Sequence, residues 1–179
     1  MTKKRVRPAK PMLIAVDGVE PGAVLTAARA ALGGSARGGI SRWDASGVFQ
    51  ELAVADDAAG APSAQTLLLL YAADLAFRLR WQIRPALAEG RTVVAAPYVD
   101  TALAFGRAAG LKPSWLMNLF RFAPRPAKRC FVHARPAHAA AVTDGFVGFS
   151  GARMAGASVA ARRKIAAQTA TELRRRFDR

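Results

Sequence analysis

The chain has 179 residues, 52% of them hydrophobic, which is enough for one globular domain with a sizeable core. Its formal net charge of +15 favours contact with polyanions such as nucleic acid, nucleotides or acidic proteins. The single cysteine, Cys130, excludes an internal disulfide and a multi-cysteine metal site. The apolar runs are too short for a signal-peptide core or a membrane span. We therefore expect a cytoplasmic protein with no membrane association.

The N-terminal region predicts a basic arm followed by a strand, a turn and a helix. Residues 1–11 are expected to be disordered, and residues 12–179 to form a single domain. Met12–Val16 is a short apolar run typical of a buried strand, and Ala23–Leu32 has the composition of a helix. The glycine-containing turn between them completes the layout of a phosphate-binding P-loop.

The residues that give a P-loop its chemistry are missing. A working loop needs a lysine that reaches the β- and γ-phosphates, followed by a hydroxyl that binds Mg²⁺. Counted from Gly18, those two positions hold Val24 and Leu25. Pro21 removes an amide donor, and Glu20 adds a negative charge. We define the degenerate phosphate loop as Gly18, Glu20, Gly22, Val24 and Leu25.

The middle of the chain alternates between helical and strand patterns. The Gly- and Ser-rich segment 35–47 predicts a loop, and residues 48–54 a short strand or the start of a helix. Ser63 is a suitable N-cap for a helix over Gln65–Leu87, which Pro85 should kink or divide. The next elements are expected to be a strand at 92–96 and a helix at 100–109.

The C-terminal part continues this alternation and ends in a basic helix. The expected elements are a helix at 114–120, a strand at 129–134, a short helix at 137–142, a strand or loop at 144–149, and a helix at 158–177. Short apolar strands that alternate with helices predict a three-layer α/β fold, in which helices flank a parallel sheet.

Several stretches, taken in order, carry a family resemblance. They are Leu13-Ile14-Ala15-Val16-Asp17-Gly18, Leu68-Leu69-Leu70-Tyr71-Ala72-Ala73-Asp74, Ile83-Arg84-Pro85-Ala86-Leu87-Ala88-Glu89-Gly90 and Tyr98-Val99-Asp100-Thr101-Ala102-Leu103-Ala104-Phe105. Together they resemble bacterial thymidylate kinase, a P-loop nucleoside monophosphate kinase. The resemblance implies a P-loop-kinase-like sheet and a homodimer formed by helix packing. Candidate faces for that dimer are the helices at 65–87 and 100–109.

The same alignment shows which functional positions of the family are lost. The family's Asp-Arg pair falls on Ala96-Pro97, its phosphate-binding arginine on Leu75, and its base-recognising glutamine on Gly106. Tyr71 and Phe105 keep aromatic rings where the family places the nucleoside. By resemblance, a surviving nucleoside pocket would comprise Arg42, Tyr71, Asp74, Tyr98 and Phe105. The alternative is that these aromatic residues pack in the core, as aromatic residues at helical spacing usually do.

These losses favour a catalytically inactive protein that keeps the scaffold as a binding or assembly module, with a nucleoside or nucleotide as its first candidate ligand. Phosphoryl transfer depends on positioning and charge neutralisation. Because the residues that provide both are lost, we expect no cofactor. One alternative is an active dTMP kinase that uses ATP and Mg²⁺, with Arg29, Arg37 or Arg42 replacing the lost cations. Another is a protein that binds nucleic acid through Lys3–Lys10 and Arg162–Arg176, although charged segments are often only solvated faces. No His, Cys, Asp or Glu spacing predicts a metal site.

Overall fold

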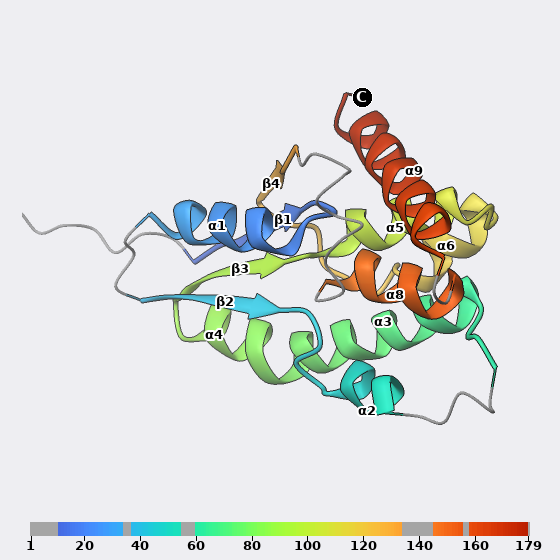
Figure 1. Ribbon diagram of the computed structural model, residues 1–179. Coiled ribbons are helices and arrows are strands. Elements are labelled where there is room, and N and C mark those ends of the chain that lie inside the picture. Colours follow the sequence, from blue (N-terminus) through green and yellow to red (C-terminus); the bar gives the residue numbers. More distant parts are fainter. Residues whose placement is uncertain (1–10, 34–36, 55–59, 134–144, 156–157, 179) are drawn as a thin grey trace, which may run out of the picture.

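The computed structural model of the chain describes residues 11–33, 37–54, 60–133, 145–155 and 158–178 (Figure 1). A four-stranded sheet in the order β2-β3-β1-β4 lies at its centre, and all three strand pairings are parallel. The strands are β1 (Leu13–Asp17), β2 (Gly38–Arg42), β3 (Thr92–Ala96) and β4 (Lys128–Phe131). This sheet, with helices on both of its faces, confirms the predicted α/β class.

The two central strands are buried because both faces of the sheet are covered. Every residue of β1 is buried, and Leu13, Ile14 and Ala15 lie in register with Val93, Val94 and Ala95 of β3. Parallel strands covered on both faces have nearly continuous apolar sequences. This explains why both strands could be predicted from short apolar runs.

Helix α1 (Pro21–Leu32) covers one face of the sheet, where Val24 and Ala28 pack with Ile14, Val16 and Val94. The larger core lies on the other face. It is built from β1, β3 and the helices α3, α5, α6, α8 and α9. Figure 1 shows α1 on the opposite side of the sheet from α3 and α4. The architecture therefore has three layers.

The long helix predicted at 65–87 is continuous but not uniform. It comprises α3 (Ala64–Arg78), a π-helical segment at Leu79–Ile83, and α4 (Arg84–Ala88). Ser63 caps its start by accepting a hydrogen bond from the Thr66 amide at 3.0 Å. The widened turn lies directly before Pro85, which has no amide proton and collides with the preceding turn of a regular α-helix.

In the first half of the chain, the structure revises the expectation for segment 35–47 and decides between the two alternatives for residues 48–54. Segment 35–47 is not all loop, because β2 forms there as an edge strand. Its glycines and single apolar residue hide the strand pattern. Residues 48–54 form a helix, α2 (Val48–Val54), whose first amides are held by the Asp44 carboxylate; the bonds from Phe49 and Gln50 measure 2.9 and 3.1 Å.

The second half follows the predictions more closely. Helices α5 (Val99–Ala108), α6 (Pro113–Leu119) and α9 (Val159–Phe177) are confirmed. The expectation of a strand or loop at 144–149 is wrong, because α8 (Phe146–Ala155) begins there and packs against α9. The predicted basic arm and the short helix at 137–142 lie outside the described residues, apart from Pro11. No helix in the described ranges has the length and apolar character needed to cross a bilayer.

Helix α9 packs along α5, and this corrects one dimer expectation. The residues of α5 from Asp100 to Gly106 are all buried within the single chain. A helix that is already covered cannot also present its apolar face to a second copy. Of the two candidate dimer faces, only the one on the long helix that begins at α3 is exposed.

Candidate functional site

The degenerate phosphate loop comprises the turn that follows β1 and the first residues of α1. The Glu20 side chain turns back to cap this helix and accepts hydrogen bonds from the amides of Gly22 and Ala23 at 2.8 and 2.5 Å. The first amides of a helix are the donors that bind phosphate in a P-loop. In this chain a side-chain carboxylate already occupies them.

The rest of the loop is filled with apolar side chains. A Cβ placed on Gly18 would lie only 2.7 Å from Cγ2 of Val24, so Val24 packs directly on the glycine. A cavity of about 60 Å³ remains beside Val24 and Leu25, and another of about 20 Å³ beside Gly18. Small-molecule sites measure roughly 300 Å³ or more, so neither cavity can hold a nucleotide.

Asp17 places a buried negative charge beneath this loop. Its Oδ1 accepts hydrogen bonds from the Tyr98 amide, the Thr101 amide and the Thr101 hydroxyl at 2.8–2.9 Å. Its Oδ2 is buried with no hydrogen-bond partner among the described residues. Burial and the nearby Asp100 charge raise the pKa of Asp17 to about 6, although the three hydrogen bonds oppose the rise. At neutral pH the carboxylate is therefore mostly ionised and repels phosphate.

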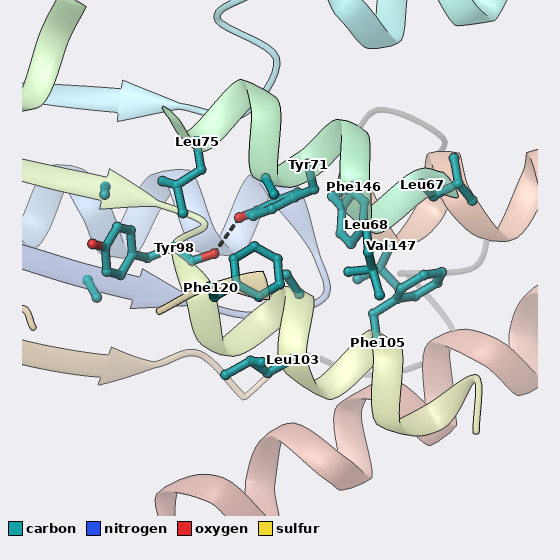
Figure 2. Packing of buried hydrophobic residues seen from close by; sticks show 14 of the residues in the cluster. Leu67, Leu68, Tyr71, Leu75, Tyr98, Leu103, Phe105, Phe120, Phe146 and Val147 are labelled. Carbon is teal, nitrogen blue, oxygen red and sulfur yellow. Dashed lines mark hydrogen bonds between the residues drawn. The ribbon is translucent and has the colours of Figure 1, made fainter. Parts of the chain in front are cut away.

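The two aromatic residues expected to hold a nucleoside lie in the core (Figure 2). Tyr71 on α3 and Phe105 on α5 are both fully buried, and the ring of Phe146 from α8 lies between them. The centroid of Phe146 is 4.5 Å from Tyr71 and 5.1 Å from Phe105. Phe120 packs edge-on against Tyr71 at 6.0 Å. Tyr71 and Phe105 therefore pack in the core, which was the alternative interpretation of these two residues.

Tyr98 is also held inside the molecule. Its carbonyl accepts the hydroxyl proton of Tyr71, and its own hydroxyl donates to the carbonyl of Pro124 at 2.8 Å (Figure 2 shows the first bond). Burial raises the pKa of both tyrosines. The Tyr71 hydroxyl thus joins α3 to the segment after β3, and the Tyr98 hydroxyl joins that segment to the loop at Pro124.

Asp74 is held by structural partners, including a nearby arginine. Its carboxylate accepts hydrogen bonds from the amides of Asp44 and Ser46 and from the Ser46 hydroxyl, at 2.9–3.2 Å. Arg78, one turn further along α3, is fully buried, with Nη1 3.9 Å from Oδ2 of Asp74. The i, i+4 spacing of two opposite charges on an otherwise apolar helix was the available signal.

The Arg78 guanidinium joins α3 to two strand ends. It donates to the Ser41 hydroxyl at 3.0 Å, to the Ser41 carbonyl at 2.8 Å and to the Pro97 carbonyl at 3.0 Å. Buried charges are retained where they are paired and hydrogen-bonded. The pair therefore fixes β2 and the loop after β3 onto the long helix.

Arg42 lies apart from the other expected pocket residues. It is exposed at the end of β2 and borders a cavity of about 720 Å³ between α2 and α8, which Trp43, Phe49 and Phe149 also line. Tyr71, Tyr98 and Phe105 do not reach this cavity. The structure thus brings together the buried members of the expected nucleoside pocket and leaves Arg42 outside. Among the described residues, no three His, Cys, Asp or Glu side chains are arranged to hold a metal ion.

The fold and the strand–turn–helix at its start define a P-loop-kinase-like α/β protein. Within that class, the chain is similar to thymidylate kinases, as the resemblance in its sequence predicted. It is 45% identical over 58 residues to the probable thymidylate kinases of Pyrococcus abyssi, Pyrococcus horikoshii and Thermococcus gammatolerans. That stretch is 32% of this chain and 28% of each relative, so it spans less than a third of their length. No protein-family model matches the chain.

A solved structure shows the same fold. The thymidylate kinase of Ehrlichia chaffeensis superposes with a TM-score of 0.59, over 69% of this chain and 72% of that one. The sequence identity in this comparison is 17%, so the likeness concerns the fold alone.

Proposed function

We propose that the chain is a catalytically inactive, thymidylate-kinase-like protein that serves as a binding or assembly module. The observation that carries this proposal is the position of Phe146, whose ring fills the space between Tyr71 and Phe105. Those two residues are where resemblance to the family places the nucleoside. A base cannot stack there while Phe146 occupies the space.

The phosphate side of the site supports the same conclusion. Glu20 occupies the loop amides, Val24 and Leu25 stand at the lysine and hydroxyl positions, and Asp17 adds a buried carboxylate. Phosphoryl transfer requires cations that neutralise the phosphates and a bound metal ion. This loop presents carboxylates and apolar groups instead.

The assembly role is supported by an apolar stripe on the long helix. Leu69, Phe77 and Trp81 are 52%, 38% and 62% exposed, and they lie on one side of the helix at spacings of four and eight residues. Contiguous exposed apolar surface of this kind marks a protein–protein contact. We infer that two copies pack through this stripe, in a reducing compartment such as the cytoplasm, where Cys130 stays a free thiol.

A thermal-shift titration of the whole chain tests the loss of ligand binding. A ligand that binds only the folded state raises the unfolding midpoint according to its occupancy. We expect no shift with dTMP and none with ATP plus Mg²⁺, each titrated to millimolar concentration. A saturable shift with both, together with ADP formation that depends on dTMP, would show an active kinase and overturn the proposal.

A further inference from the structure

A groove runs along the seam between α5 and α9, away from the degenerate phosphate loop. It consists of two hollows of about 540 and 390 Å³, which share Arg107, Glu172 and Arg175 as lining residues. Helix α6 and the end of β4 close the larger hollow. The two hollows meet at these three shared side chains.

Four arginines line this groove and are arranged around two carboxylates. Asp100 binds both Arg129 and Arg176, with Nη2–Oδ distances of 2.7 and 2.8 Å. Glu172 likewise binds Arg175 at 2.7 Å and lies 3.9 Å from Arg107. Each carboxylate thus pairs with two guanidinium groups. One carboxylate and two arginines together carry a net positive charge.

These contacts also hold the arginines in place. Arg129 donates to Asp100 through Nε and Nη2, and its guanidinium lies 4.5 Å from the ring centroid of Phe177. Arg176 donates to the other oxygen of the same carboxylate through Nε and Nη2. A guanidinium has five N–H donors, so groups fixed in this way can accept a further carboxylate at a lower entropic cost.

The floor of the larger hollow is apolar. Leu103 and Leu116 form its buried part, while Pro113 and Met117 of α6 are exposed, Met117 with 60% of its surface. Methionine is flexible and adapts to varied apolar partners. A basic rim above an apolar floor is complementary to an apolar side chain flanked by carboxylates.

We propose that this groove binds an acidic peptide segment of a protein partner, with a leucine-like side chain on Met117 and carboxylates on Arg107 and Arg175. The excess positive charge of the arginines and the apolar side chains of the larger hollow suit such a peptide. Single-stranded nucleic acid requires exposed aromatic platforms. Phe177, the aromatic ring at this end of α9, already stacks on Phe131 and contacts the Arg129 guanidinium. The inference gives the proposed assembly module its partner class, and it does not depend on the dimer stripe of α3.

Fluorescence anisotropy with the full-length chain tests this proposal. The probe is a labelled twelve-residue peptide of glutamates with two central leucines. Its controls are the glutamine counterpart, the serine-for-leucine counterpart and a twelve-nucleotide oligothymidylate. We expect saturable binding of the acidic leucine peptide, weakened about tenfold by replacing its leucines, as the loss of a buried apolar anchor predicts.

Variants of the chain locate the binding. The double change Arg107→Gln and Arg175→Gln should weaken binding at least about tenfold, and Met117→Ser about threefold or more. A matched control, Arg29→Gln with Arg84→Gln, removes two exposed arginines elsewhere and should change the affinity less than about twofold. Circular dichroism confirms that each variant is folded.

Three outcomes would overturn the proposal. An equal loss in the control double variant would show that the net charge alone attracts the peptide. Tighter, competing binding of the oligothymidylate would make the groove a nucleic-acid site. Absence of saturable peptide binding would leave the seam without a peptide function. Because none of these results depends on dTMP or ATP, failure here is distinct from failure of the inactive-kinase proposal.

Discussion

The ring centroids of Phe146 and Tyr71 lie 4.5 Å apart, with the ring planes inclined by 58°. Phe146 begins α8 and Tyr71 lies in the middle of α3, so this contact joins two helices that are distant in sequence. Phe49 of α2 and Phe105 of α5 complete the surroundings of Phe146, at 5.9 and 5.1 Å. Phe146 thus lies at the centre of an aromatic cluster in the core.

Removing that ring should destabilise the protein strongly. Phe146→Ala deletes a fully buried aromatic side chain, and we expect the free energy of unfolding to fall by about 3–5 kcal/mol. Urea unfolding followed by tryptophan fluorescence measures the change. The exposed Phe122→Ala is the matched control and should cost less than about 1 kcal/mol.

The resulting cavity offers a second measurement. An apolar cavity of this kind stays dry and binds small aromatic molecules. Benzene should therefore raise the unfolding midpoint of Phe146→Ala and leave that of the native chain unchanged. A cost below about 1 kcal/mol for Phe146→Ala would mean that the ring is not an integral part of the core.

Replacing Glu20 should restore anion binding at the start of α1. Glu20→Ala removes the N-cap, with an expected loss of about 0.5–2 kcal/mol in the free energy of unfolding. It also releases the amides of Gly22 and Ala23 that Glu20 now occupies. Since helix N-termini bind anions, sulfate should stabilise the variant more than the native chain.

The control for this experiment is Glu51→Ala, in the first turn of α2. It removes one exposed negative charge and leaves the loop intact. Thermal unfolding across a sulfate series, at constant ionic strength, separates the two variants. Equal stabilisation by sulfate in both would mean that the net charge, and not the loop amides, attracts the anion.

The sequence predicted the elements whose signals are local. Apolar runs marked β1 and β3, and the cap Ser63 marked the start of α3. The edge strand β2 was missed because neighbouring elements stabilise it. Its glycines Gly38 and Gly39 pair with β3, and Arg78 donates to Ser41 near its end.

The same distinction applies to the candidate site. The losses at Val24 and Leu25 could be read directly from their positions in the loop. The roles of Glu20 and Phe146 could not be predicted, because they depend on tertiary contacts. Glu20 was recognised as a negative charge but not as the cap of α1, and Phe146 reaches Tyr71 only once α8 has packed against the core.

The apolar stripe on the long helix should make the protein a dimer. We expect the native chain to sediment as a dimer at micromolar concentration. The double change Leu69→Glu and Trp81→Glu should weaken association at least about tenfold, because it places carboxylates at the centre of the contact. Val54→Glu, on α2, adds a charge at another exposed apolar position and should leave the dimer intact. A monomer for the native chain at these concentrations would contradict the prediction.

Asp17 should make the stability depend on pH in a defined window. Its pKa is about 6 in the folded chain, against an ordinary value of 3.8 for an aspartate. At a pH below both pKa values, the Asp17 carboxyl is protonated in the folded and the unfolded chain, so it does not change the free energy of unfolding. Between about pH 4 and 6 the unfolded chain releases this proton first, so the free energy of unfolding falls as the pH rises. Above about pH 6 the decrease in the free energy of unfolding levels off at roughly 3 kcal/mol.

Asp17→Asn removes this titration, while the amide oxygen can still accept the bonds from Tyr98 and Thr101. The native chain should lose roughly 2–3 kcal/mol more than the variant between pH 4 and pH 7.5. Urea unfolding of both proteins at the two pH values measures this difference and cancels the contributions of groups away from the site. Asp178→Asn, at an exposed aspartate, should follow the native profile. Parallel profiles for Asp17→Asn and the native chain would show that burial does not raise the pKa of Asp17.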